Sequence, residues 1–241
     1  MHTKSNSAHT KRLPVLGFCL VITLSTGCVS GEFYGISALN PYTRQQWAED
    51  ERMGPTFHQR ISELRATKRS AKSFEPQQQE QTVARMTELI RDDENPLIRA
   101  AGVRVLGEIS TISALPGIQA AAVDADPLVR VAASEAFGRR ADSDAAAGLS
   151  RLATDDADTD VRLSAVAALG NCEDQQAVQA LSLALDDGNP AIQNRAVQSL
   201  RSSTGQSLGD NVAVWRAYLH GEPSPILPTE SLADRVRRIF Y

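Results

Sequence analysis

The sequence is poor in aromatic residues and in cysteine. Phenylalanine, tryptophan and tyrosine together make up 5% of the 241 residues, and there are three cysteines. The strands of a β-sandwich favour aromatic and β-branched residues, so the scarcity of aromatics argues against that fold. Three cysteines exclude a scaffold held together by several disulfides. The length allows one or two globular domains.

Long apolar runs and an excess of positive charge are missing as well. Beyond the N-terminal region, no stretch reaches the roughly 18 apolar residues of a membrane-spanning helix, which excludes a multi-span membrane protein. The formal net charge is -4. This balance argues against nucleic acid as a partner, because binding to phosphates requires clustered cations.

Residues 1–27 are expected to form a lipoprotein-type signal peptide. Residues 1–12 carry three cations and no acid, residues 13–24 are almost wholly apolar or small, and Gly27 precedes Cys28. This order is typical of a secretory signal. The Gly-Cys end resembles a bacterial lipoprotein signal, in which the cysteine is acylated and becomes the first mature residue. The position three before the cysteine departs from that pattern, and ordinary cleavage or an uncleaved anchor are the alternatives.

The signal predicts the localisation of the protein and the net charge of the mature chain. Two acyl chains on Cys28 would anchor the chain stably to a membrane, so we expect a lipoprotein of the cell envelope that faces the periplasm or the exterior. Without residues 1–27 the chain has 25 - 3 = 22 basic and 29 acidic side chains, a net charge of -7. Such a surface should repel nucleic acid and anionic lipid.

The middle of the chain repeats. Four similar segments begin at aspartates that lie 31, 32 and 31 residues apart, at residues 93–99, 124–130, 156–162 and 187–193. Each segment contains an asparagine or aspartate of the kind that caps helix N-termini. In three of the four this residue is followed by proline, which suits the first turn of a helix.

Apolar and small residues then recur every four positions, which predicts the first helix of each unit. Gly107, Gly138 and Gly170 are expected to end the first three of these helices, as C′ glycines do. A second helix is expected at 114–123, 145–153, 175–185 and 211–220. One such hairpin cannot bury its own apolar face, so the units must stack. The residues of the stripes are Ile98, Gly102, Leu106, Val129, Ala133, Phe137, Val161, Ala165, Leu169, Ile192, Ala196 and Leu200.

The repeated motif resembles HEAT repeats of the short type first noted in phycobilisome lyases. The resemblance covers residues 92 to 220. It implies an all-α fold, a right-handed α-solenoid of about four HEAT-like hairpins at 92–221 with N-terminal capping helices at 56–91. The signal and the repeats together also resemble envelope lipoproteins of planctomycete-type bacteria.

The flanking segments are expected to lead to the solenoid or to cap it. Residues 28–55 form a tether with a short helix, and residues 65–76, which are basic and polar, form a loop between the capping helices. Residues 222–241 form a proline-rich linker and a C-terminal amphipathic helix. That helix either caps the last repeat or contacts a partner or an anionic membrane.

The resemblance also implies a ladder of charges. In HEAT-like proteins the aspartate and arginine columns commonly pair between neighbouring repeats. Because the period of the ladder is that of the fold, we expect it to be structural and not catalytic. Such a pair fixes the register of the repeats more than it adds stability. Its expected members are Asp93, Asp124, Asp156 and Asp187 with Arg99, Arg130 and Arg162, and Gln193 interrupts the arginine column.

No catalytic constellation emerges from the residues. The mature chain contains only His58 and His220, and neither has metal-ligand spacing. The aspartates at 155–160 lack the glycine and the distal glutamate of an EF-hand. Cys172 is expected to be a semi-buried turn residue without redox chemistry. We therefore expect no catalysis, no cofactor, no metal and no small-molecule substrate.

The sequence thus predicts a protein-interaction scaffold whose partner is another protein. The second helices are expected to line the binding face, with contacts from Gln119, Arg151, Gln179 and Ser182. A structural envelope lipoprotein without a dedicated ligand is the main alternative. A bilin-lyase-like enzyme is a remote one, because it rests on fold alone.

Overall fold

The computed structural model describes residues 54–223 and 225, and all regular structure among these residues is helical. The described part contains no strand, in agreement with the predicted all-α class. Its α-helices are α2 (Phe57–Ser70), α3 (Pro76–Asp92), α4 (Pro96–Leu106), α5 (Leu115–Ala121), α6 (Pro127–Arg140), α7 (Ser143–Asp155), α8 (Thr159–Leu169), α9 (Gln175–Ala184), α10 (Pro190–Thr204) and α11 (Val212–His220). Two short 3-10 helices, η2 (Ala71–Ser73) and η3 (Ile112–Ala114), precede α3 and α5.

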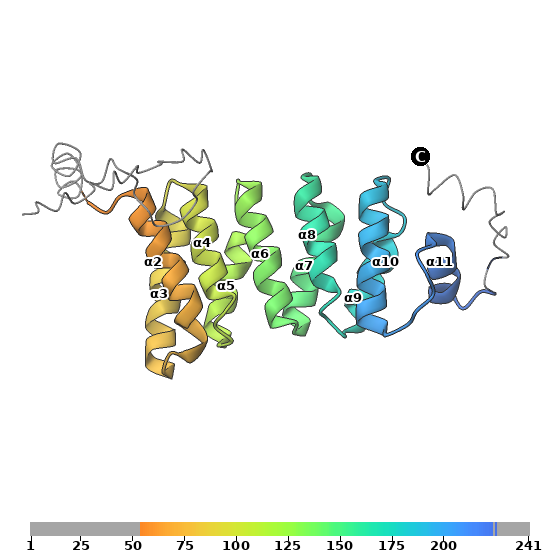
Figure 1. Cartoon of the computed structure of the whole chain (residues 1–241), viewed down its shortest axis with the longest axis horizontal. Coiled ribbons are helices and arrows are strands. Elements are labelled where there is room, and N and C mark those ends of the chain that lie inside the picture. The colour runs from red at the N-terminus through yellow and green to blue at the C-terminus, as the bar shows by residue number, and fades with distance from the viewer. Residues whose placement is uncertain (1–53, 224, 226–241) are drawn as a thin grey trace, which may run out of the picture. The chain divides into compact units, whose positions relative to one another are not determined.

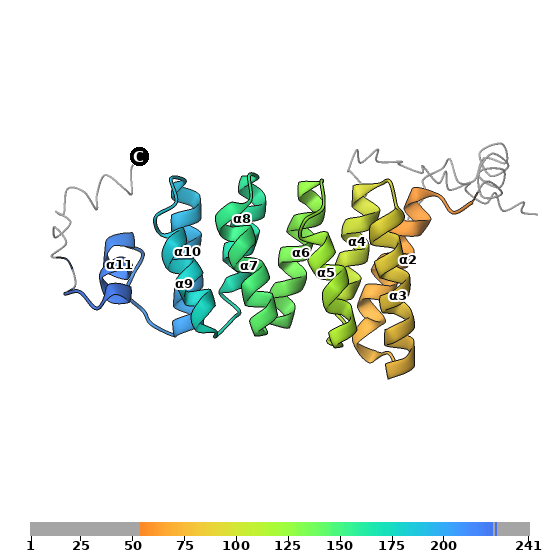
Figure 2. The same ribbon diagram turned by 180° about the vertical axis from the view of Figure 1, so that it is seen from behind.

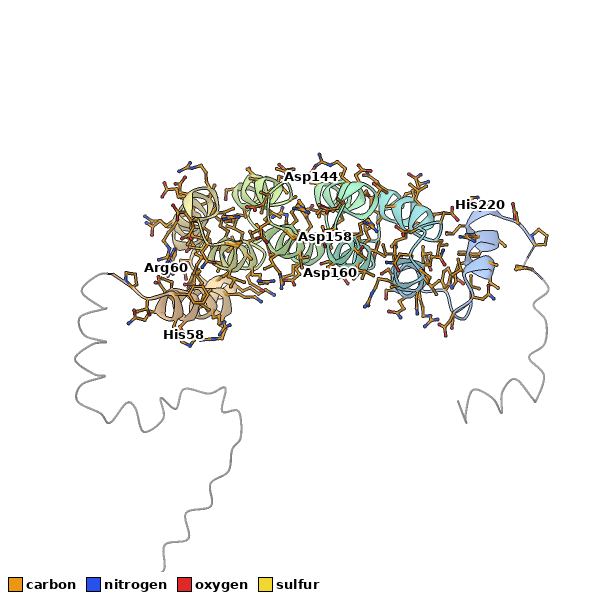
Figure 3. All side chains as sticks on the ribbon, turned by 90° about the horizontal axis from the view of Figure 1, so that it is seen from above. His58, Arg60, Asp144, Asp158, Asp160 and His220 are labelled. Carbon is orange, nitrogen blue, oxygen red and sulfur yellow. The ribbon has the colours of Figure 1, made fainter. Side chains whose placement is uncertain are left out.

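The helices pack in sequential pairs and form two layers (Figures 1 and 2). The first helices of the pairs, α2, α4, α6, α8 and α10, form one layer, and α3, α5, α7 and α9 form the other. The two rows are seen from above in Figure 3. Within the first layer α4 packs on α6, α6 on α8 and α8 on α10. In the second layer α7 packs on α9, and it also contacts α8 across the two layers. This arrangement confirms the predicted HEAT-like solenoid.

The helices start where the repeated motif places their N-caps. The side-chain oxygens of Asn95, Asp126 and Asn189 each accept a hydrogen bond of 2.9 Å from the backbone amide two residues on. Asp158 caps α8 in the same way. These bonds satisfy amides that have no partner within the helix.

The repeated apolar columns form the core that runs through the stack. Every member of the three columns is buried, including the glycine and alanines of the middle one. Burying a large apolar side chain stabilises the fold by about 1.5–3 kcal/mol. Because each column packs against the next pair, this stabilisation is shared between neighbours.

Gly107 and Gly170 directly follow the last residues of α4 and α8, as predicted, but neither adopts the left-handed conformation of a C′ glycine, and Gly138 does not end its helix. Gly107 and Gly170 have φ angles of -63° and -62°, and Gly138 lies inside α6. Each glycine instead lies against the next first helix. A Cβ on Gly138 would lie 2.8 Å from the Cβ of Ala168. The column is therefore glycine because the neighbouring helix comes too close for a side chain.

The loop predicted at 65–76 is also largely helical. α2 continues to Ser70, and η2 follows it directly. Arg65 and Arg69 are exposed on α2, and Lys72 is exposed on η2, while Leu64 and Ala71 are buried. Because the segment contains so many cations, its sequence does not show the narrow apolar stripe by which the helix could have been predicted. The predicted signal peptide, Cys28, the tether helix and the C-terminal amphipathic helix lie outside the described residues.

Candidate functional site: the charge ladder and the exposed layers

An arginine from each of α4 and α6 forms a bidentate ion pair with the aspartate of the next repeat. Arg99 donates from Nε and Nη2 to the carboxylate of Asp124 at 2.9 and 2.8 Å. Arg130 donates in the same way to Asp156 at 2.7 and 2.9 Å. Both pairs are largely buried, and the Asp156 side chain is 6% exposed. Two parallel bonds fix direction as well as distance.

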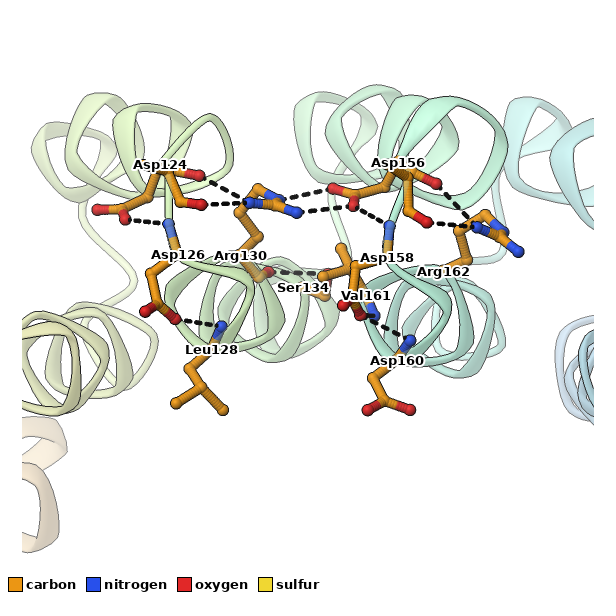
Figure 4. A network of polar contacts seen from close by, with 12 residues as sticks. Asp124, Asp126, Leu128, Arg130, Ser134, Asp156, Asp158, Asp160, Val161 and Arg162 are labelled. Carbon is orange, nitrogen blue, oxygen red and sulfur yellow. Dashed lines mark hydrogen bonds and ion pairs between the residues drawn. The ribbon is translucent and has the colours of Figure 1, made fainter.

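Each ladder residue also holds its own repeat together (Figure 4). The Nη1 of Arg130 donates to the carbonyl oxygens of Asp124 and Ala125, which lie in the loop before α6. The carboxylate of Asp156 accepts the backbone amide of Asp158 at 2.9 Å. The ladder therefore joins loop, helix and next loop in one network, in which both carboxylate oxygens of Asp156 accept hydrogen bonds.

The ladder changes at both ends of the described repeats. The pair between Arg162 and Asp187 is longer, at 3.5 Å. Gln193 donates to the carbonyl of Asp187 at 2.8 Å, as the arginines do within their repeats, but it forms no ion pair. Asp93, at the other end, pairs with Arg60 of α2.

Arg60 is a ladder residue that sequence reasoning missed. It lies four positions after the N-cap Thr56, just as Arg99 lies four positions after Asn95. This spacing was a usable signal. The separation of 33 residues between Arg60 and Asp93, against 25 between Arg99 and Asp124, obscured it. α2 and α3 therefore form a helical pair of the same kind as the later ones.

The side chains expected to contact a partner lie in the layer of second helices. Gln119, Arg151 and Gln179 are exposed and Ser182 is half-buried. Gln119 and Arg151 line one hollow of about 460 Å³ between α5 and α7, which brings these two together. Gln179 and Ser182 lie on α9 and do not line it.

The sequence matches the family model described as HEAT repeats over residues 83–170 and 147–214. Together these matches span more than half of the chain. The chain belongs to the HEAT-repeat family. No curated protein matches the sequence. Among solved structures, human deoxyhypusine hydroxylase in complex with glycerol is similar to this HEAT protein, with a TM-score of 0.48 and 19% sequence identity. The match covers 52% of this chain and 44% of the human enzyme, so this chain spans less than half of that protein.

Two carboxyl groups of the HEAT ladder, those of Asp124 and Asp156, have lowered pKa values. Hydrogen bonds from Arg130 outweigh burial and lower the pKa of Asp156. Burial acts to raise the pKa of Asp124, but hydrogen bonds from Arg99 and from the amide of Asp126 together outweigh it and lower that pKa. A carboxylate held in this way is a poor general acid or base at neutral pH.

The other chemically active side chains of the HEAT repeats are scattered or buried. His58 lies on α2 and His220 at the end of α11, at opposite ends of the described helices (Figure 3). Burial raises the pKa of the Cys172 thiol, with smaller contributions from Asp142 and Asp174, which disfavours the reactive thiolate. Between residues 54 and 223, no group of three or more potential ligands is arranged to hold a metal ion.

Proposed function

We propose that this HEAT-repeat protein is a lipid-anchored scaffold outside the cytoplasm, which binds another protein and performs no catalysis. HEAT arrays present extended surfaces to their partners. The observation that carries the proposal is the hollow between α5 and α7. It lies in the layer of second helices, and its lining includes both apolar residues such as Val123 and charged residues such as Arg151. Stacked repeats hold such a surface rigidly, which lowers the entropic cost of binding.

The lining of this hollow suits a protein partner. Val123 is 79% exposed and supplies an apolar contact. Arg151 is exposed and forms no ion pair with another described residue, while Asp155 and Asp156 line the same hollow. A partner with an apolar side chain beside a carboxylate could contact Val123 and pair with Arg151 at the same time. Arginine is one of the residue types that commonly contribute most of the binding energy of protein interfaces.

Copurification of cross-linked partners from envelope fractions tests the binding face. Arg151→Glu should reduce the yield of the copurified protein about tenfold, a loss of about 1.4 kcal/mol in binding. Arg195→Glu is the matched control, because Arg195 is also an exposed arginine but lies on α10 of the other layer. Equal yields from both variants would reject this face. Recovery of only further copies of the same chain would reject the scaffold and favour a structural envelope component.

The proposed anchor is the acylated Cys28. Between residues 54 and 223, no helix combines the length and hydrophobicity needed to cross a membrane. The net charge of -7 expected for the chain without residues 1–27 would repel an anionic bilayer. Attachment would therefore depend on the acyl chains.

Fractionation of cells that produce Cys28→Ser tests the anchor. The variant should move from the membrane pellet to the soluble fraction, because it retains no site for the thiol-linked acyl chains. Cys172→Ser is the control, since Cys172 lies in a buried turn of the repeats and has no place in the signal. Membrane retention of Cys28→Ser at the level of the unaltered protein would disprove the anchor.

A further inference from the structure

A second hollow lies in the layer of first helices, between α2 and α4. It has a volume of about 330 Å³, and its apolar lining includes Phe57, Ile61, Leu97 and Ala101. Phe57 and Leu97 are 45% and 48% exposed, so two large apolar side chains are presented to whatever enters. We call this hollow the α2–α4 groove.

The charge of the α2–α4 groove is opposite to that of the body around it. Residues 54–223 contain 23 acidic and 17 basic side chains, a net charge of 17 - 23 = -6. Yet Arg65, Lys68 and Arg104 line the groove, and no carboxylate does. Four further hollows among the described residues, the one between α5 and α7 among them, each include at least one aspartate or glutamate.

The cations of the groove differ in how far they are neutralised. Arg104 pairs with Glu135 at 2.8 Å, and Lys68 lies 3.8 Å from Glu108. Their side chains still remain 35% and 36% exposed. Arg65 is exposed and forms no ion pair with any described residue. A carboxylate that arrives at the groove would therefore find one arginine that has no ion-pair partner among the described residues, and two further cations nearby.

We propose that the α2–α4 groove docks an acidic segment of a partner protein, which places a large apolar side chain between Phe57 and Leu97 and a carboxylate on Arg65. This inference rests on the proposed scaffold function, but it concerns the opposite layer of helices. The volume is at the small end of ligand sites, which suits one or two side chains of a peptide. Charge-assisted bonds from an arginine add direction to such an apolar contact.

An anionic membrane is the competing occupant, and the geometry favours a peptide. Membrane-binding surfaces present apolar side chains on a protruding face. Here they line a hollow, which a flat bilayer surface reaches poorly, and the acidic body would be repelled from anionic lipid. A peptide chain can insert a single side chain into a hollow of this size.

Selection from a phage-displayed library of random dodecapeptides on the full chain in detergent tests the inference. The enriched peptides should combine aspartate or glutamate with leucine, phenylalanine or another large apolar residue. Arg65→Glu and Leu97→Asp should each raise the dissociation constant of an enriched peptide at least about tenfold. Both positions are exposed, so the variants should fold, and circular dichroism at 222 nm should show unchanged helix content.

Matched controls separate the groove from general charge and hydrophobicity. Leu128 is the second residue of α6, as Leu97 is of α4, and both are 48% exposed. Arg69 is exposed on α2 but does not line the groove. Leu128→Asp and Arg69→Glu should leave the dissociation constant within about twofold of the unaltered chain. Equal effects of controls and groove variants would overturn the proposal.

Three other results would also overturn the proposed docking at the α2–α4 groove. None of them would by itself contradict the scaffold function. These are an absence of enriched peptides, enrichment of peptides without acids, and loss of binding to phosphatidylglycerol vesicles in Arg65→Glu but not in Arg69→Glu. The last would assign the groove to lipid. If the groove fails while Arg151→Glu still reduces copurification, the scaffold function stands without this second site.

Discussion

At the scale of single residues, the arginine four positions after the N-cap of α2, α4, α6 and α8 connects two repeats. Arg130 donates to carbonyls of its own loop and to the carboxylate of the next loop. The cost of withdrawing two charges from water offsets much of their attraction. Such a pair is therefore expected to matter most when one partner is lost, because the other charge is then buried alone.

We expect Asp156→Ala to lower the free energy of unfolding by about 3 kcal/mol, because it leaves the guanidinium of Arg130 without its partner. Urea unfolding followed by circular dichroism measures this difference. Asp155→Ala is the control, since Asp155 is an exposed neighbour outside the ladder. It should change stability by less than about 0.5 kcal/mol. Similar values for both variants would show that the ladder contributes little.

The lowered pKa values of Asp124 and Asp156 predict a loss of stability in acid. A carboxyl whose pKa is lower in the folded state contributes stability above its unfolded pKa of about 3.9. This contribution disappears as the pH falls through the folded-state pKa. Asp156→Asn should therefore lose less stability than the unaltered chain between about pH 6 and pH 3. An equal loss would assign the acid sensitivity to other groups.

At the scale of the helices, spacing between neighbours is set by the glycine column. A Cβ on Gly107 would lie 2.9 Å from the Cα of Ala136, and one on Gly170 would lie 3.0 Å from the Cα of Ser199. These obstacles are backbone atoms, which cannot turn aside as a long side chain can. The first helices therefore approach one another closely in each of these steps.

Gly138→Ala should consequently destabilise the protein by about 1–3 kcal/mol, the usual cost of overpacking, despite the better helix propensity of alanine. The Cβ contact with Ala168 is the cause. Gly188 offers a matched control, because nothing lies within 4 Å of its Cβ position. Gly188→Ala should be neutral or stabilising by up to about 1 kcal/mol. Thermal unfolding of the two variants measures both effects, and a stable Gly138→Ala protein would contradict the close-approach explanation.

The ends of the array explain why sequence reasoning succeeded for some helices and failed for others. α6 has neighbours on both sides and buries seven of its residues, so its apolar stripe is broad and easily recognised in the sequence. α2 is the first described helix and buries only Leu64 among 14 residues. Its polar C-terminal half was therefore predicted as a loop. The prediction of the ladder failed at the same end, because the separation between Arg60 and Asp93 differs from the separation between Arg99 and Asp124.

At the scale of the whole molecule, the repeated columns determine the stack but not its binding surfaces. Buried positions such as Val161 recur at a fixed period because every repeat meets the same neighbour. The α2–α4 groove instead combines Phe57 and Arg65 from one pair with Leu97 from the next, and these three residues lie outside the buried columns. Only the three-dimensional structure brings these residues together, which is why the fold was predictable and this site was not.

A stack held by shared interfaces should also unfold as a unit over several repeats. Val161 is fully buried in α8, between α6 and α10. Val161→Asp buries a charge that lacks a partner, and should destabilise α8 together with the helices packed on it. Hydrogen exchange should show lost amide protection from α6 to α10.

The matched control for that experiment is Leu183→Asp, because Leu183 is 61% exposed on α9. It should leave protection unchanged apart from local effects of less than about 1 kcal/mol. Protection lost in α8 and α9 alone, with α6 and α10 unchanged, would show that each helical pair is stable by itself. That result would contradict the nearest-neighbour stabilisation on which the whole array is argued to depend.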